Sequence, residues 1–230
     1  MMTLTSPVSY LLDESGLRVG HQNVYNVFNK VPDISSFLSN EHPCIPLLGL
    51  SETRLDYCMS DESIAIPQYL TFRRDALKQG ETGLAIYIHS SLQSITNRCA
   101  DLESQSVESL WVEISHSKSP SLLAGFVYRN PTATYASYDE FLAMLDKVAN
   151  SKKDILPLGD INIDLSKSYS VWESTYSLVV SLHQLVNKPT RVTSTTDTLI
   201  DHIPTNRQDL AHCVSVPNIG ISDHYPVHCT

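Results

Sequence analysis

Short runs of apolar residues, separated by polar and turn-forming residues, recur along the chain and predict β-strands. The runs lie at 17–24, 45–50, 69–73, 84–89, 93–97, 107–115, 122–129 and 156–159. The four runs between 69 and 115 predict an antiparallel meander. Pro46 lies near the start of the second run, so the first residues of that strand are expected outside a central ladder.

Three stretches carry apolar residues at helical spacing. The first follows the opening strand and includes Ile34 and Phe37. The second is preceded by Ser137 and Glu140, three positions apart, which predict a capping box at its start. The third is expected around 171–185. These helices should lie outside the sheets, because a helix with one apolar stripe must bury it against another layer.

The final third returns to short β-rich runs, at 191–195, 198–203, 213–216 and 220–227. No internal repeat or linker interrupts the chain, and 230 residues suffice for one large domain. Two β-rich halves that each contain a helix predict an α/β (α+β) architecture. We expect two mixed sheets that pack face to face with helices outside.

The overall charge limits how the protein could bind nucleic acid. Sixteen basic and 25 acidic residues give a net charge of −9, so any contact with nucleic acid must rest on a local patch. Five cysteines without a CxxC pair are typical of reduced thiols rather than a disulfide framework or a zinc site. No stretch approaches the ~18 apolar residues of a membrane span. We therefore expect an intracellular protein that contacts no membrane.

Polar residues recur where the predicted buried strands end. The run into Gly159 is followed by Asp160 and Asn162, and strand alternation would place Asp164 on the same side. Similar positions elsewhere hold Asn23, Glu52, Tyr128, Asp201, His202, Asp223 and His224. Each has an ordinary explanation as a turn residue. Together they suit metal-assisted phosphodiester cleavage, because a hard divalent ion prefers carboxylate oxygens.

The ordered set resembles the endonuclease/exonuclease/phosphatase superfamily, and most of all the apurinic-endonuclease-like domain of non-LTR (LINE-like) retrotransposons. The resemblance rests on Asn23, Ser51-Glu52-Thr53, Tyr128-Arg129-Asn130-Pro131, Gly159-Asp160-Ile161-Asn162, Leu199-Ile200-Asp201-His202 and Ser222-Asp223-His224. It implies a four-layer α/β sandwich over 17–230, after an N-terminal extension at 1–16.

The resemblance also implies roles for individual residues. The catalytic side chains would be Asp160, His224, Asp201, Tyr128 and Asn162. Mg²⁺, which Mn²⁺ can replace, would be held by Glu52 with Asn23 and Asp223. The DNA phosphates would contact Arg129, Thr190, Arg191 and Ser222. His21 is expected to be structural or exposed.

Several positions depart from the family pattern. Tyr25 and Asn26 stand where many relatives have a basic residue and a serine, so a potential phosphate contact is lost. Ile161 replaces a more usual aromatic residue, and Gly83 stands alone where a glycine pair is common. Pro204 is expected to shorten its strand. No expected catalytic side chain is missing.

The function implied is a Mg²⁺-dependent endonuclease that nicks one strand of double-stranded DNA and leaves a 3′-hydroxyl. A linked reverse transcriptase domain or element RNA would be its partner, and the nucleus its place of action. Loops around 53–68 and 163–172, and the stretch 190–206, are expected to sense DNA shape. Two alternatives stay open: hydrolysis of a small phosphoester, and a decayed remnant that only binds DNA or protein.

Overall fold

Two parallel strand–helix–strand units form the middle of the molecule in the computed structural model, which describes residues 16–40, 44–77, 79–104, 107–116, 120–167 and 181–230. The first unit comprises β1 (Val19–Asn23), α1 (Val31–Asn40) and β2 (Leu47–Ser51). The second comprises β7 (Leu122–Tyr128), α2 (Tyr135–Ala149) and β8 (Asp154–Asp160). Each helix lets the chain return so that its two strands pair in parallel.

Each parallel pair is extended by antiparallel strands into a five-stranded sheet of the described chain. The first sheet has the order β14-β1-β2-β4-β3, with β3 (Tyr69–Arg74), β4 (Leu84–His89) and β14 (Val227–Cys229). The second has the order β12-β8-β7-β6-β5, with β5 (Thr96–Arg98), β6 (Glu108–Ile114) and β12 (Asp201–His202).

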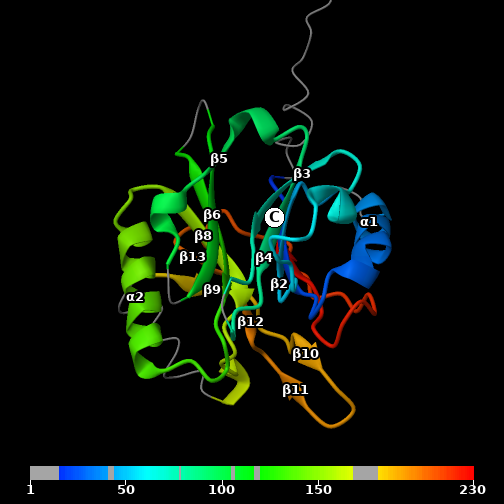
Figure 1. The fold of residues 1–230 in the computed structure, drawn as a ribbon. Helices are drawn as coiled ribbons and strands as arrows, with labels where there is room; N and C mark the ends of the chain where they lie inside the picture. Colours follow the sequence, from blue (N-terminus) through cyan, green and yellow to red (C-terminus); the bar gives the residue numbers. More distant parts are fainter. Residues whose placement is uncertain (1–15, 41–43, 78, 105–106, 117–119, 168–180) are drawn as a thin grey trace, which may run out of the picture.

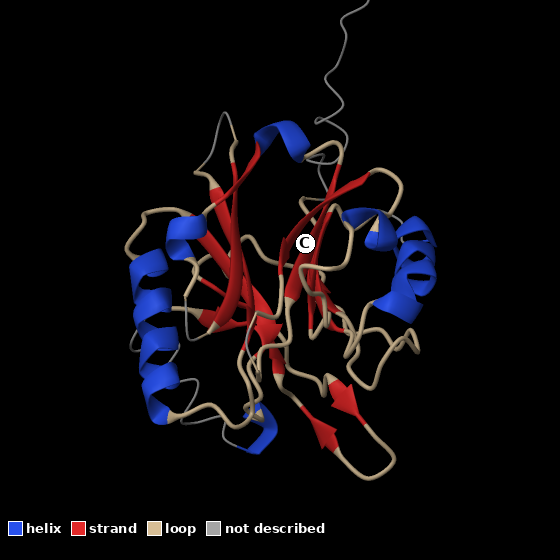
Figure 2. Cartoon of the chain, in the orientation of Figure 1, coloured by secondary structure: helices blue, strands red, loops and turns tan. Residues whose placement is uncertain are grey.

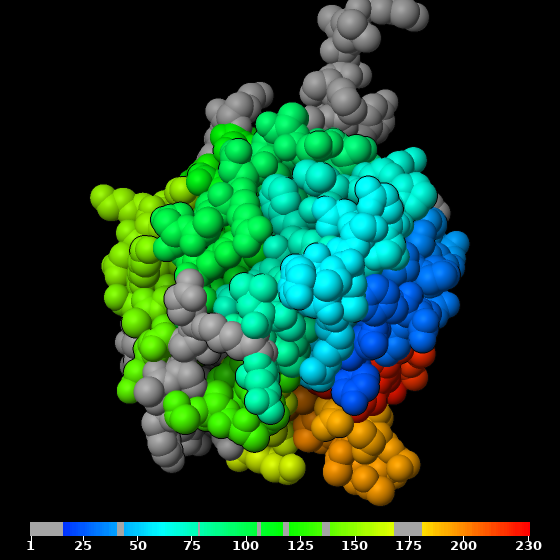
Figure 3. All heavy atoms as spheres, in the orientation of Figure 1, coloured from blue at the N-terminus to red at the C-terminus, as the bar shows by residue number. Residues whose placement is uncertain are grey.

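Shorter elements lie outside the two five-stranded sheets. Strands β10 (Arg191–Val192) and β11 (Asp197–Thr198) form a hairpin, and β9 (His183–Gln184) pairs with β13 (Pro204–Thr205). Single 3₁₀ turns are η2 (Phe28–Lys30), η3 (Asp61–Ile64), η4 (Gln93–Ile95) and η5 (Ala100–Leu102). The β10–β11 hairpin protrudes from the body of the molecule, where it is orange in Figure 3.

The layers run α2, second sheet, first sheet, α1 (Figures 1 and 2). Ile34, Phe37 and Leu38 bury the apolar stripe of α1. The two sheets approach closely because β2 carries Gly49 opposite the Phe126 ring of β7, where a Cβ would lie 1.8 Å from a ring carbon. The predicted four-layer sandwich is confirmed.

Two predictions about local structure are wrong. The strands between 69 and 115 do not form one meander, because β3 and β4 pair in the first sheet while β5 and β6 pair in the second. Helix α2 begins at Tyr135, two residues before Ser137, so the start predicted at Ser137 is wrong. The apolar pattern located these elements, but it carries no information about which sheet a strand joins.

The helix expected at 171–185 is corrected at its end, because 183–184 form β9. Residues 168–180, with Leu178 and Val179, lie outside the described part of the chain. Leu182 is buried in the main core, as its apolar character suggested. None of the helices in the described ranges is long and apolar enough to cross a membrane.

Candidate active site

The carboxyl ends of both parallel strand pairs meet at one end of the sandwich. Strands β1 and β8 end in Asn23 and Asp160, and β7 ends in Tyr128. The Asn23 amide joins the sheets, because its Nδ2 donates to Glu52 Oε1 at 2.8 Å and to Asp160 Oδ2 at 2.9 Å. Ligands of open α/β sheets commonly bind beyond the carboxyl ends of strands.

These strand ends surround a pocket of about 430 Å³ that is lined by Asn23, Tyr25, Glu52, Tyr128, Pro131, Asp160, Asn162, Arg191, Asp223 and His224. A second cavity, of about 460 Å³, lies at the opposite ends of β1, β7 and β8 and is lined mainly by apolar side chains such as Leu17, Leu122 and Leu156. We place the active site in the first pocket, because the carboxylates of Glu52, Asp160 and Asp223 and the imidazole of His224 converge there at the carboxyl ends of the strands.

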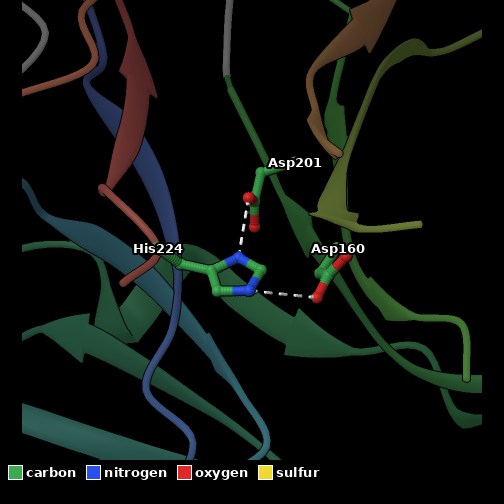
Figure 4. Close-up of side chains that lie close together, drawn as sticks. All are labelled: Asp160, Asp201 and His224. Carbon is green, nitrogen blue, oxygen red and sulfur yellow. Dashed lines mark hydrogen bonds and ion pairs between the residues drawn. The ribbon is translucent and has the colours of Figure 1, made fainter. Parts of the chain in front are cut away.

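His224 lies between two carboxylates in this pocket (Figure 4). Its Nδ1 is 2.9 Å from Asp201 Oδ2, and its Nε2 is 3.9 Å from Asp160 Oδ2. All three side chains are buried. The Thr190 hydroxyl also donates to Asp201 Oδ2, at 2.7 Å. Asp201 therefore orients the imidazole and leaves Nε2 on the side of Asp160.

The three ionisable groups of this cluster affect one another's pKa values. Burial alone would lower the pKa of His224, but the carboxylates of Asp201 and Asp160 outweigh burial and raise the pKa to about 9. Burial and the charge of Asp201 raise the pKa of Asp160. Burial would likewise raise the pKa of Asp201, but His224 outweighs it and lowers that pKa. The result is an imidazolium beside an ionised Asp201, with Asp160 poised to take up a proton.

Asn162 reaches the pocket through a turn and not through strand alternation. Its φ of +53° is left-handed, and its backbone N–H donates to Asp160 Oδ1 at 2.9 Å. The predicted alternation is therefore wrong beyond Asp160. Asp164 points elsewhere: its Oδ1 accepts the backbone N–H of Leu199 at 3.1 Å. Asparagine tolerates this backbone conformation better than most residues.

Tyr128 presents a phenol to the same pocket. Burial, followed by the charges of Glu52 and Asp160, raises its pKa well above the usual range. The phenol therefore stays protonated and can donate a hydrogen bond to a phosphate oxygen without adding negative charge.

The donor set of the pocket fits a hard divalent cation. Glu52, Asp160 and Asp223 all offer carboxylate oxygens to one cavity. Glu52 Oε2 pairs with the Arg54 guanidinium at 3.0 Å, which shows that a positive charge is accommodated at this carboxylate. Asp160, Asp201 and His224 also lie close enough to share an ion. The raised pKa of His224 works against that arrangement, because a protonated imidazole has no lone pair to donate.

The residues predicted to contact DNA phosphates occupy different positions. Arg191 lies at the rim, where its Nε donates to Asp223 Oδ2 at 2.8 Å. Arg129 does not line the pocket; its guanidinium donates to the carbonyls of Ile161 and Ala133. Ser222 donates to the Asn23 carbonyl and accepts the backbone N–H of His224. It therefore ties the loop that carries His224 to β1.

A direct phosphate contact by Thr190 does not fit the structure, because the side chain is fully buried behind Asp201. Its hydroxyl accepts the backbone N–H groups of Ile200 and Asp201 while donating to the Asp201 carboxylate. Thr190 is instead a positioning residue for Asp201.

Two residues near the site were not predicted. His21 is buried, with Nε2 3.1 Å from Ser51 Oγ and Nδ1 3.6 Å from Asp201 Oδ1. Burial lowers its pKa to about 4, so it is neutral. Its position two residues before Asn23, on the same strand face, was the available signal. Arg54, which pairs with Glu52, carried no such signal, because an arginine in a loop is usually solvated.

The fold itself has solved counterparts. An AP endonuclease from Leishmania major superposes with a TM-score of 0.68 at 13% identity, over 100% of this chain and 91% of that one. A Neisseria 3′ phosphatase bound to a product DNA hairpin gives 0.67 at 17% identity, over 94% and 99%. An endonuclease/exonuclease/phosphatase family protein from Leptotrichia buccalis gives 0.65 at 11% identity, over 94% and 99%.

No protein-family model and no curated protein matches the sequence. At these identities the structural likeness shows the fold alone, which is an α/β sandwich shared with these proteins. One of the three neighbours is described as an AP endonuclease and another as a 3′ phosphatase. The activity of the present chain has to be argued from its own site.

Proposed function

We propose that the protein is a divalent-metal-dependent phosphodiesterase that nicks one strand of DNA. The observation that carries the proposal is that His224, held by the buried Asp201 behind it, lines one pocket together with Asp160 and Glu52. A cationic imidazole fixed by a buried carboxylate is suited to bind a phosphate oxygen. A second, poorly solvated carboxylate is suited to orient and deprotonate water.

In the proposed reaction, Asp160 takes a proton from a water molecule that attacks phosphorus. The bond from phosphorus to the 3′ oxygen breaks, which leaves a 5′-phosphate, and the 3′ oxygen takes up a proton from solvent water to become the 3′-hydroxyl. His224 and the Tyr128 phenol bind the phosphate oxygens as negative charge develops. One hydrogen of the Asn162 amide is used by the Arg129 carbonyl, and the other is left for the phosphate.

Glu52 would hold Mg²⁺, with Asn23 and Asp223 nearby, and the ion would neutralise charge on the phosphate. Mn²⁺, with similar preference for oxygen ligands, would substitute. Asn23 keeps Glu52 and Asp160 at a fixed separation, because its single amide nitrogen contacts both. Removal of the ion with EDTA should therefore abolish hydrolysis.

The finer part of the proposal concerns the biological context. The ordered motifs favour a retrotransposon endonuclease, whose 3′-hydroxyl product would prime a linked reverse transcriptase on element RNA. That role requires action on double-stranded chromosomal DNA, and hence a nuclear location. The protruding β10–β11 hairpin begins with Arg191, which lies at the pocket rim, and the hairpin is suited to contact a duplex.

The test is conversion of supercoiled plasmid to open circle, with Mg²⁺ and with EDTA. Asp160→Asn should lower the nicking rate at least 100-fold, in the range typical for a general base, with an unchanged circular dichroism spectrum. Asp164→Asn is the matched control, because Asp164 lies outside the pocket, and should stay within about threefold of wild type. Metal-independent nicking, or full activity of Asp160→Asn, would contradict the proposal.

A second candidate is hydrolysis of a small phosphoester. The net charge of −9 favours it, because a duplex repels an acidic surface. The same catalytic residues would serve. Parallel assays of plasmid, short oligonucleotides and inositol phosphates with wild-type protein separate the two functions. Hydrolysis confined to the inositol phosphates would replace the nuclease by this second function.

A further inference from the structure

Tyr25 is an exposed aromatic residue at the mouth of the pocket. Its relative exposure is 66%, and it lines the same pocket as Glu52 and His224. A large aromatic side chain that stays exposed gains no free energy from burial, so the exposed orientation of Tyr25 needs a local cause. The structure supplies that cause in the backbone.

The backbone holds the Tyr25 ring at the rim. Its φ is +57°, a left-handed value that is unfavourable for a bulky residue. The backbone N–H of Tyr25 donates to Asn23 Oδ1 at 2.9 Å, so the residue that joins the two sheets also fixes the tyrosine. Glu52, Arg54 and Asn162 have left-handed φ values as well. Strained backbone therefore gathers around this pocket, as it does at many functional sites.

Arg54 braces the ring from one side. Its guanidinium carbon lies 5.5 Å from the Tyr25 ring centroid, within the range of a cation–π contact, and it also pairs with Glu52. The ring is thus held by a charged side chain that is itself anchored beside the proposed metal ligand. Most of the tyrosine surface remains open to solvent.

We propose that Tyr25, braced by Arg54, is a stacking platform for the nucleobase adjacent to the scissile phosphate. The inference rests on the proposed function, and it specifies a nucleic acid, rather than a sugar or inositol phosphate, as the substrate class. A flat, pre-positioned ring suits a base, because every base has a π-face and stacking needs no particular sequence. Tyr25 stands where the family pattern has a basic residue. In this protein the tyrosine ring contacts a nucleobase, whereas the basic residue would contact a phosphate.

The test compares two single-stranded probes of equal length and charge. Both carry the same 5′-fluorescein label; one is a 12-mer with its bases, and the other is a 12-mer in which abasic sites replace the bases. Binding is measured by fluorescence anisotropy with Mg²⁺, and every variant carries Asp160→Asn so that the probes stay intact. The parent protein should bind the base-containing strand more tightly than the abasic strand.

Tyr25→Ala should weaken binding of the base-containing strand about 5- to 150-fold, the range expected for the loss of one stacked base. Binding of the abasic strand should change much less, so the preference between the strands falls. Tyr25→Phe should retain the preference. Tyr25→Leu, which keeps an apolar side chain of similar bulk, should lose it. Arg54 is left unchanged, because it contacts Glu52.

The matched control is Tyr57→Ala, at a tyrosine that is 85% exposed but does not line the pocket. This variant should bind both strands as the parent does. Equal weakening of both strands by Tyr25→Ala, or an unchanged preference, would overturn the platform. The binding test is independent of the plasmid-nicking test. If the protein nicks plasmid but does not prefer the base-containing strand, only the stacking platform is refuted. If it prefers the base-containing strand but does not nick plasmid, only the endonuclease is refuted.

Discussion

Single side chains decide the geometry of this site because each makes several contacts. Asn23 uses one nitrogen for Glu52 and Asp160 and one oxygen for the backbone of Tyr25. Thr190 similarly satisfies the Asp201 carboxylate and two backbone N–H groups. Such residues touch no substrate in our proposal, but their loss would leave buried polar groups unsatisfied, which is costly.

His202 leads to a prediction about pH. Its side chain is fully buried, with Nε2 3.0 Å from the Ile163 carbonyl, and burial lowers its pKa to about 4 from 6.5. As pH falls through this interval, the unfolded chain takes up a proton before the folded protein does. The His202 contribution to the free energy of unfolding is therefore lost progressively, by up to about 3 kcal/mol.

The measurement is urea unfolding of wild type and His202→Gln between about pH 6.5 and pH 4. The variant should be less stable at the upper pH, and the difference from wild type should narrow as pH falls. His183→Gln, at a solvent-exposed histidine of β9, is the control for loss of an imidazole as such. A difference that stays constant or widens toward pH 4 would show that His202 titrates normally in the folded protein.

At the scale of elements, the close approach of β2 and β7 brings the two sheets' polar ends together. Gly49 is the contact point, because any side chain there collides with the Phe126 ring. Gly49→Ala should lower the free energy of unfolding by about 3 kcal/mol, the upper part of the range for overpacked cores. It should also lower nicking activity, since Glu52 follows β2 directly and Tyr128 ends β7.

Gly20→Ala is the matched control for this prediction. Gly20 lies in the neighbouring strand β1, where an added Cβ would be 3.3 Å from the nearest side-chain atom. Gly20→Ala should therefore lower the free energy of unfolding much less than Gly49→Ala does. Phe126→Leu combined with Gly49→Ala should recover part of the Gly49→Ala loss, because the two positions are in contact. If chemical unfolding shows that the two glycine variants lose the same free energy of unfolding, the two sheets can move apart to accommodate the added methyl group.

At the scale of the whole molecule, the proposed nuclease has a net charge of −9 and would therefore bind DNA mainly through its site. Arg54 and Arg191 are the arginines beside the pocket, and each already pairs with a carboxylate. The salt dependence of binding should therefore be weak. We expect a slope of log K against log salt shallower than about −3, because each neutralised phosphate contributes about −0.9.

This slope can be measured by anisotropy with a short duplex and the Asp160→Asn protein, between about 50 and 200 mM salt. Arg191→Gln should reduce the slope by about one if Arg191 contacts a phosphate. A slope of about −6 or steeper would reveal a cationic surface that the distribution of charge does not suggest.

The amino-acid sequence by itself determined most of the strands, the two outer helices and the polar residues at the strand ends, whereas the strands predicted at 213–216 and 220–227 are absent from the described chain apart from Val227, which begins β14. These features depend on local patterns: an apolar period of two or 3.6, and a polar residue where a buried strand stops. Asp160, Asp201 and His224 were predicted in this way and by resemblance, and the structure brings them together. Helix α1 and strands β7 and β8 likewise followed from local pattern.

Only the tertiary structure decided which strands share a sheet, and which polar residues face the pocket. The separation of β4 from β5, the burial of Thr190 behind Asp201 and the contact of Arg54 with Tyr25 all join residues whose relation depends on long-range packing. The predicted alternation of side chains along residues 160–164 also fails beyond Asp160, because the backbone turns at Asn162, which has a left-handed φ. The local sequence pattern determines which face of a helix or strand is buried. Long-range packing determines which residues that face contacts.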